Sequence, residues 1–229
     1  YEERRRAHER LATIGQLAAS IGHELRNPLA VMETSMHLVA KRIDDPRAEK
    51  HIARVREQLA ISGSIITDLL ETARDRPPER VYVRLETLVD EALKLVLLFE
   101  GVRIARHIPE SLPMVSLDRT QFRQLIVNLV LNAAQSLSSG KREGTVTIEA
   151  AMDGTDLVVR VRDDGPGLTL EAERRLFEPL FTTRTRGVGL GLPLCRRIAE
   201  KHGGTIRGSN LGPPDAPTGA CFEVRVPAS

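Results

Sequence analysis

Apolar residues in the first part of the chain recur at alternating intervals of three and four positions. The series includes Leu11, Ile14 and Ala18 and keeps the same rhythm as far as Val39. This spacing is typical of helices that pack along an apolar seam in a coiled coil or a helical bundle. It predicts a first long helix over residues 3–41.

A second stretch with the same seam follows a helix-breaking sequence. Asp44 and Asp45 interrupt the pattern, Pro46 suits the first turn of a new helix, and the seam resumes at Ile52. Two antiparallel helices with one seam each bury too little surface alone, and pairing two such hairpins solves this problem. The pattern therefore predicts that residues 1–76 form the helical hairpin of a homodimeric four-helix bundle.

The periodicity changes after Arg76-Pro77-Pro78, a sequence typical of a stiff linker. Asp153-Gly154 is a strong hairpin signal between two strand-like runs, and Asp118 is a suitable helix N-cap. The mixture predicts an α+β sandwich with one layered sheet for residues 77–229. The expected strands are 81–83, 102–108, 145–152, 155–161, 205–208 and 221–226, and the expected helices are 85–99, 118–137 and 192–202.

Composition narrows the class of protein. The net charge of +2 from 33 basic and 31 acidic residues gives no basic footprint for nucleic acid. Two cysteines without metal-ligand spacing favour a reducing, cytoplasmic setting. No run approaches the roughly 18–20 apolar residues of a membrane span. Because the sequence opens without Met in a helical pattern, we expect a piece of a longer protein, attached to a membrane only through a preceding region, if at all.

His23 is the first residue with a chemical setting. It lies two positions past the seam residue Ile21, on the outward face of the first predicted helix. Glu24 can accept the ring Nδ1–H and so leave Nε2 as a nucleophile. Asn27 lies one turn further on the same face, and Pro28 removes a backbone donor beside it. A lone histidine is more often packed or solvated, as we expect for His8, His37, His51, His107 and His202.

Polar and glycine-rich segments in the second part of the chain suit a nucleotide. Asn128 and Asn132 share one helix face, and their neutral amide oxygens suit Mg²⁺ without repelling phosphates. Gln135 can reach the same region. The DDGPG sequence at 163–167 directly follows a predicted strand. Its carboxylate can accept a hydrogen bond from an exocyclic amine such as that of adenine. The GVGLG sequence at 187–191 precedes a helix, whose N-terminal amides can hold phosphates.

The sequence around His23 resembles a known phosphoacceptor motif. SIGHELRNPL at 20–29 is similar to the H-box of HisKA dimerisation and phosphoacceptor domains. The resemblance implies that His23 becomes phosphorylated, that Glu24 acts as an acid–base helper, and that Asn27 assists the kinase and phosphatase steps.

The second part resembles the GHKL ATPase family. LIVNLVLNAA at 125–134 is similar to the N-box, DDGPG and GVGLG to the two glycine boxes, and FEPLFTTR at 177–184 to the F-box. The resemblance implies ATP as ligand, Asn132 as the Mg²⁺ ligand, Asp163 as the adenine contact and residues 168–190 as a mobile lid. The nucleotide residues expected in this way are Asn128, Asn132, Gln135, Asp163, Gly165, Gly167, Thr182, Thr183, Arg184, Gly187, Gly189, Leu190 and Gly191.

Together the motifs resemble the core of a two-component sensor histidine kinase, of the nitrogen-regulation-like branch. The resemblance implies autophosphorylation of His23 from ATP and transfer to an Asp of a response regulator receiver domain, with phosphatase activity toward that phospho-regulator. Transfer within one subunit and between subunits both fit the sequence. Two other interpretations are a GHKL ATPase that only hydrolyses ATP, as gyrase, MutL and chaperones do, and a non-enzymatic dimeric scaffold with a degenerate site.

Overall fold

The computed structural model describes residues 25, 27–43, 45–73, 76–94, 101–139, 143–182, 189–213 and 216–229. Its contacts separate the chain into two compact units, Tyr1–Arg76 and Pro77–Ser229. Within the described residues, no helix is both long and apolar enough to cross a membrane.

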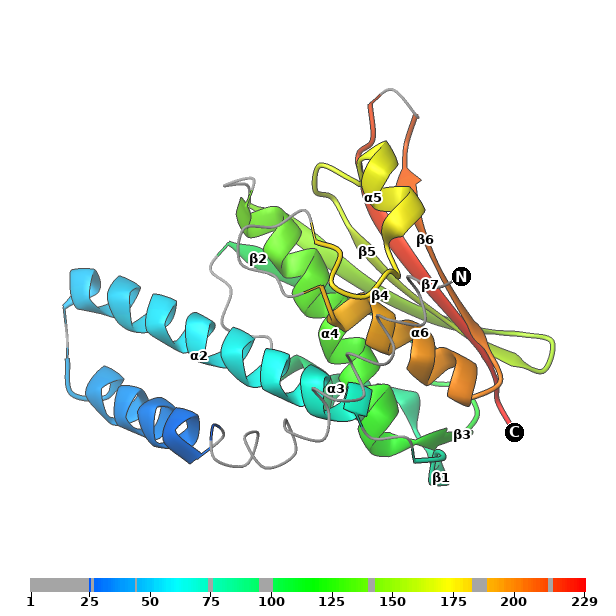
Figure 1. Cartoon of the computed structure of the whole chain (residues 1–229), viewed down its shortest axis with the longest axis horizontal. Coiled ribbons are helices and arrows are strands. Elements are labelled where there is room, and N and C mark those ends of the chain that lie inside the picture. The colour runs from blue at the N-terminus through cyan, green and yellow to red at the C-terminus, as the bar shows by residue number, and fades with distance from the viewer. Residues whose placement is uncertain are drawn as a thin grey trace. The chain divides into compact units, whose positions relative to one another are not determined.

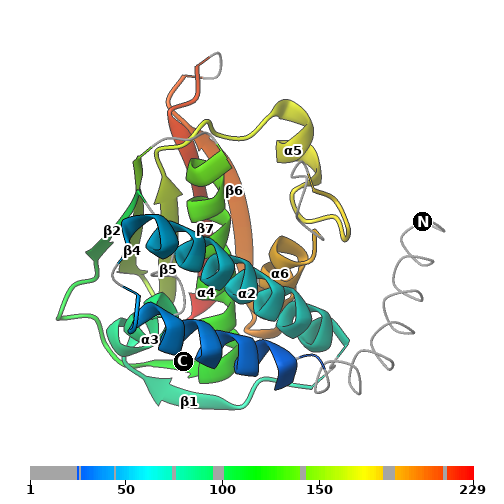
Figure 2. The same cartoon turned by 90° about the vertical axis from the view of Figure 1, so that its left-hand side faces the viewer.

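The first unit is a helical hairpin, as predicted. Residues 27–40 are helical, and α2 spans Pro46–Ala73. The Asp45 carboxylate accepts a hydrogen bond from the Arg47 amide at 2.8 Å, so Asp45 satisfies one of the free amides at the start of α2. Figures 1 and 2 show the two helices side by side. The expected start of the first helix lies outside the described residues.

The second unit is built on a five-stranded sheet in the order β2-β4-β5-β7-β6. Strand β2 runs parallel to β4, and all other neighbours are antiparallel. The predicted hairpin around Gly154 is confirmed, because Asp153 and Asp156 are Cα partners. The strands are β2 (Val102–His107), β4 (Gly144–Asp153), β5 (Asp156–Asp163), β6 (Thr205–Leu211) and β7 (Gly219–Pro227).

Helices α4 (Arg119–Ser139) and α6 (Gly191–Lys201) pack on the sheet, and α3 (Leu85–Leu93) packs against α4. Figure 2 shows α4 running along the sheet, and Figure 1 shows α6 beside it. Alternate residues of β4 are buried, as a strand with one covered face requires. Phe122, Leu125, Leu129 and Phe222 form part of this core and are at most 1% exposed. The predicted two-layer α+β sandwich is therefore confirmed.

Three details of the predicted elements were wrong. A separate two-stranded sheet pairs β1 (Arg80–Val83) with β3 (Val115–Asp118), where the sequence suggested one sheet and a loop before Asp118. Strand β3 has only four residues and lies close to Pro113, so it is too short to show an alternation of apolar and polar positions. Helix α3 ends at Leu93, whereas the sequence predicted an end at Phe99. The prediction ran too far because the apolar run after Leu93 carries no sequence signal for a helix end. The short helix α5 (Leu170–Arg175) was not expected within the lid segment.

A buried histidine joins the ends of α4 and α6. His202 is 0% exposed, and its Nε2 accepts a hydrogen bond from the Asp118 amide at 3.0 Å. Its Nδ1 lies 2.8 Å from the Ile198 carbonyl oxygen, which can only accept. The ring must therefore be neutral, with its proton on Nδ1. We expected this histidine to be packed or solvated, and it is packed. Its bond to Asp118 was not predicted, because the contact spans 84 residues of sequence.

The same network holds the start of the second unit. The Asp118 carboxylate accepts from the Glu79 amide at 2.9 Å and, through its other oxygen, from the Thr120 and Gln121 amides at 3.0 Å. Asp118 is thus the predicted N-cap of α4 and also a partner of the linker exit. Arg80 donates to the His202 carbonyl oxygen at 2.8 Å.

We expect the His202 ring to make stability depend on pH. Burial lowers the pKa of His202 below its usual 6.5, and the nearby Arg80 also lowers it, although the Ile198 carbonyl raises it. The unfolded chain therefore binds a proton first as pH falls. The stability that neutral His202 contributes is complete above about pH 6.5 and is lost below it.

Replacement of His202 by Gln should remove this dependence. The variant should lose about 1–3 kcal/mol at pH 7.5, because the buried Asp118 amide loses a well-placed acceptor. Denaturant unfolding followed by circular dichroism at pH 7.5 and 5.5 should show a smaller pH effect in the variant than in the wild type. Equal losses in both proteins would assign the pH effect to other groups.

Candidate functional site

The register of α4 against α6 positions the main polar side chains. His202, after the end of α6, contacts Asp118 and Phe122 at the start of α4. Cys195 lies seven residues before His202, about two turns nearer the start of α6, and its Sγ is 3.7 Å from the Leu125 carbonyl oxygen. The two helices therefore run antiparallel. Extending this register by one further turn places the start of α6 beside Asn128 of α4.

The start of α6 has the form of an anion site. Its N-cap residue is Leu190, whose side chain makes no capping hydrogen bond. The amides of Gly191 and Leu192, which precede Pro193 in the first turn, therefore receive no side-chain acceptor from the cap and lie at the positive end of the helix dipole. Leu190 itself is 3% exposed, so its side chain anchors the segment in the core.

The glycine loop after β5 lies against the other half of α4. Asp163 ends β5 and is 4% exposed, and its Oδ1 accepts from the Gly165 amide at 3.0 Å. A Cβ atom at Gly165 would lie 2.7 Å from that oxygen and 3.1 Å from Ser136 Oγ. Because Ser136 lies one turn after Asn132, the loop borders the helix face that carries Asn128, Asn132 and Gln135.

The neighbouring Asp164 has a structural role in the loop. Its Oδ1 accepts from the Thr145 amide on β4 at 2.7 Å. The carboxylate thus ties the loop to the sheet while Asp163 turns inward. Of the two acidic residues in the DDGPG motif, Asp163 is the buried one and Asp164 the exposed one.

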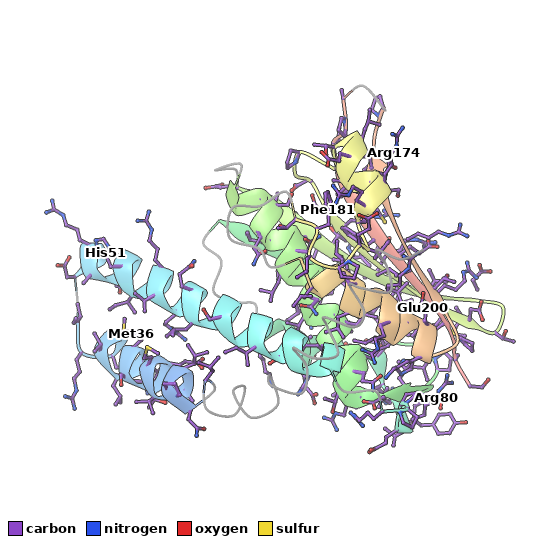
Figure 3. All side chains as sticks on the ribbon, viewed as in Figure 1. Met36, His51, Arg80, Arg174, Phe181 and Glu200 are labelled. Atoms are coloured by element: carbon purple, nitrogen blue, oxygen red, sulfur yellow. The ribbon has the colours of Figure 1, made fainter. Side chains whose placement is uncertain are left out.

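The F-box aromatics fasten the segment after the glycine loop. Thr169 caps α5 by accepting from the Ala172 amide at 3.1 Å. The Arg175 guanidinium lies 4.2 Å from the ring centre of Phe181, and that of Arg196 on α6 lies 5.0 Å from the ring centre of Phe177. Figure 3 shows Phe181 beside α5.

The F-box and the second glycine box meet at Leu180 and Gly189. The Leu180 amide donates to the Gly189 carbonyl oxygen at 3.0 Å. Gly189 has φ +70, and a Cβ atom there would lie 2.4 Å from the Phe181 carbonyl oxygen. Only glycine fits this conformation and this approach without strain. The described part of the second glycine box therefore lies directly against the F-box.

The structure thus gathers most of the predicted nucleotide residues within the second unit. Asn128 is 7% exposed, Asn132 and Gln135 are half-buried, and Thr182 is exposed. Asn27 is exposed on the first helix. His23, Glu24, Thr183, Arg184 and Gly187 lie outside the described residues.

Sequence reasoning missed two residues that hold the elements of this site in place. His202 fixes the helix register, and Asn210 on β6 binds the Leu168 backbone through both ends of its amide, at 2.6 and 2.9 Å. Neither belongs to a local motif. The only signal for Asn210 was a polar residue at the end of a strand, before the turn at Gly212.

Two family models match the chain. One, described as "Histidine kinase-, DNA gyrase B-, and HSP90-like ATPase", covers residues 117–229, and the other, described as "His Kinase A (phospho-acceptor) domain", covers residues 13–78.

Curated relatives include the signal transduction histidine-protein kinase AtoS of Escherichia coli (strain K12). It is 32% identical over 207 residues, which are 89% of this chain and 34% of AtoS. The sensor histidine kinase ZraS of the same strain is 30% identical over 203 residues, 87% of this chain and 43% of ZraS. The chain therefore spans less than half the length of these relatives.

Solved structures show the same fold. The catalytic domain of histidine kinase ThkA matches with a TM-score of 0.56 and 30% identity over 66% of this chain and 96% of that domain. ThkA in complex with the response regulator protein TrrA matches with a TM-score of 0.60 and 29% identity, covering all of this chain and 66% of that one. Full-length ShkA in complex with AMPPNP, 23% identical, matches with a TM-score of 0.62 over 93% of this chain and 46% of that one.

The close approach at Gly165 gives a test of the site. Gly165→Ala should weaken binding of a fluorescent ATP analogue at least tenfold, about 1.4 kcal/mol, because the new Cβ displaces the Asp163 carboxylate. Gly154→Ala is the matched control. Gly154 lies in the β4–β5 turn with φ +61 and open space around it, so this change should cost about 1 kcal/mol of stability and leave binding unchanged. Equal affinities for the two variants would contradict the assignment of the loop.

Proposed function

Because the chain belongs to the sensor histidine kinases of two-component systems, we propose that it phosphorylates His23 from ATP and passes the phosphoryl group to a response regulator. The observation that carries the proposal is the convergence of the N-box face, the glycine loop and the start of α6 around α4. The match of the phosphoacceptor family to residues 13–78 supports His23 as acceptor.

In this proposal the second unit holds ATP. Asp163 accepts a hydrogen bond from the adenine amine, and its own bond to the Gly165 amide fixes the carboxylate in place. Glycines 165 and 167 let the backbone approach the base. The amides at the start of α6, with Gly189, Leu190 and Gly191, bind the phosphates. Gln135, Thr182, Thr183, Arg184 and Gly187 complete the assigned set.

The polar face of α4 suits a magnesium ion between helix and phosphates. Asn132 is assigned as its ligand, with Asn128 one turn before it near the phosphates. Amide oxygens are hard, uncharged donors of the kind Mg²⁺ accepts, and half-burial of Asn132 leaves room for water and phosphate oxygens. When bound, the ion supplies neutralisation of phosphate charge.

The phosphoryl transfer is an in-line displacement. His23 Nε2 donates its lone pair to the γ-phosphorus as the bond from that phosphorus to the β–γ bridging oxygen breaks, and ADP leaves with the electron pair. The attack leaves the imidazole ring positively charged, and Glu24 neutralises the ring by accepting its Nδ1 proton. Most of the catalysis is then positioning and charge stabilisation.

The phosphoramidate on His23 is the donor for an aspartate of a receiver domain. The likeness to ThkA, solved in complex with the response regulator protein TrrA, supports such a partner. Asn27 is exposed and lies four positions after His23. It can place a water molecule for the phosphatase reaction, the hydrolysis of the phospho-regulator. Since ATP and receiver domains are cytoplasmic, we assign the chain to that compartment.

We further propose that the hairpin of residues 1–76 forms a homodimer. Seam residues Leu25, Met32, Val39 and Val55 are 39–46% exposed in the single chain. A second hairpin would cover them and complete a four-helix bundle. The stretch 76–78, between the two units, then acts as the hinge over which the ATP-binding domain, 77–229, reaches His23.

A GHKL ATPase without a phosphoacceptor is the second candidate. The family model for residues 117–229 includes gyrase B and HSP90, so the fold alone permits it. The match of residues 13–78 to a phosphoacceptor domain favours the kinase.

Incubation with γ-labelled ATP separates the candidates. The kinase should carry acid-labile, base-stable label, and His23→Gln should abolish it. His37→Gln, a change at an exposed histidine of the described first helix, should label like the wild type. Free phosphate without labelled protein would support the ATPase instead, and absence of nucleotide binding would support a scaffold.

Dimerisation has its own test. Met32→Glu should raise the dimer dissociation constant at least tenfold in analytical ultracentrifugation, because it places a charge in the seam. Val31→Glu is the control, since Val31 is 66% exposed and lies off the seam. A wild-type monomer at micromolar concentration would rule out the bundle, and equal effects of the two changes would rule out this seam.

A further inference from the structure

The strongest unassigned feature is the side-chain amide of Asn210, which bonds a loop backbone in the way that a neighbouring strand would. Asn210, near the end of edge strand β6, accepts from the Leu168 amide through Oδ1 at 2.6 Å. Its Nδ2 donates to the Leu168 carbonyl oxygen at 2.9 Å. One amide thus satisfies both backbone groups of Leu168, as a strand residue would. This places the residue after the glycine loop in a fixed position on the sheet edge.

The loop is shaped to fit this contact. Gly167 has φ +76, and a Cβ atom there would lie 2.7 Å from both Asn210 Oδ1 and Pro217 Cβ. The glycine is therefore needed where the loop passes under Asn210. This is a steric pairing between two residues 43 positions apart in the sequence, between β6 and the loop.

The other end of the loop is held by the same hairpin. Gly219, the first residue of β7, packs so closely that a Cβ atom would lie 1.8 Å from the Asp163 carbonyl oxygen. The β6–β7 hairpin therefore contacts the loop at Asp163 and again at Leu168. The residues assigned to adenine binding lie between these two contacts.

Strand β6 also carries the segment that follows. A Cβ atom at Gly208 would lie 2.6 Å from Leu176 Cδ1, so the residue after α5 packs on the same strand. Leu168, the partner of Asn210, lies at the boundary between the glycine loop and the Thr169 cap of α5. Figure 1 shows α5 beside β6 and β7.

From this geometry we propose that Asn210 is a positioning residue for nucleotide binding. It fixes the exit of the glycine loop and so helps to hold Asp163 in place. The inference rests on the proposed function of the loop as the adenine site. Because Asn210 acts on the base and not on the phosphates, its loss should raise KM for ATP and spare kcat.

Autophosphorylation kinetics and direct nucleotide binding of the whole chain test this. Asn210→Ala should raise KM for ATP, and the dissociation constant of a fluorescent ATP analogue, at least tenfold, with kcat within threefold of the wild type. Asn210→Asp keeps the acceptor for the Leu168 amide but turns the donor into a second acceptor. It should show a similar or larger rise with the side-chain volume preserved, which serves if the Ala variant folds poorly. Ser209→Ala, at the exposed neighbouring position of β6, should change nothing.

A double variant adds a readout that general destabilisation does not mimic. In the Gly167→Ala background, Asn210→Ala should raise KM much less than in the wild type, or lower it, since it removes one of the atoms that the new methyl group meets. Unchanged KM in Asn210→Ala, a fall confined to kcat, or strict multiplicative effects in the double variant would overturn the proposal.

Failure of the kinase proposal would look different. A wild-type chain that binds the analogue but labels no histidine would refute autophosphorylation, while the Asn210 effect is still read from the dissociation constants. A wild-type chain that binds no nucleotide would overturn both.

Discussion

The antiparallel register of α4 and α6 is the constraint on which the candidate site depends. The hydrogen bond from the Asp118 amide to neutral His202 fixes one end of this pair, and Cys195 packs on Leu125 further along. The start of α6 is thereby set beside the Asn128 face of α4. Both helices are rigid over this distance, so a buried ring at one end positions the amides at the start of α6, about 16 Å away at 1.5 Å per residue.

The glycine loop depends on the sheet in a comparable way. Asp163 is the last residue of β5, and its neighbour Asp164 is tied to β4 through the Thr145 amide. The β6–β7 hairpin closes on the loop from the other side. Polar groups that would bind a nucleotide are therefore set by strands and helices. A site built in this way keeps its geometry with or without ligand.

The sequence predicted the features that are local or periodic. The helix that starts at Pro46, the Asp153-Gly154 turn and the Asp118 cap each depend on neighbouring residues, and the structure confirms them. The chemical grouping of Asn128, Asp163 and Gly191 came from motif resemblance. The contacts of His202 and Asn210 could not be predicted, because their partners lie 84 and 42 positions away and no pattern in one sequence encodes such a pairing. Strand β3 was missed for a similar reason, since a four-residue strand is identified only by its partner β1.

Arg80 has a consequence for how such a unit can be joined to others. Its guanidinium donates to the carbonyl oxygens of both His202 and Ser229, and the Ala228 carbonyl oxygen accepts from the Ser116 amide on β3. Figure 3 shows Arg80 at this end of the unit, near the end of α6 that carries Glu200. Entry and exit of the polypeptide thus meet at one corner, remote from the nucleotide loops. The unit is therefore suited to transplantation as a module: new sequence spliced in at this corner, or a circular permutant with its new termini in the β4–β5 turn, would leave the nucleotide loops undisturbed.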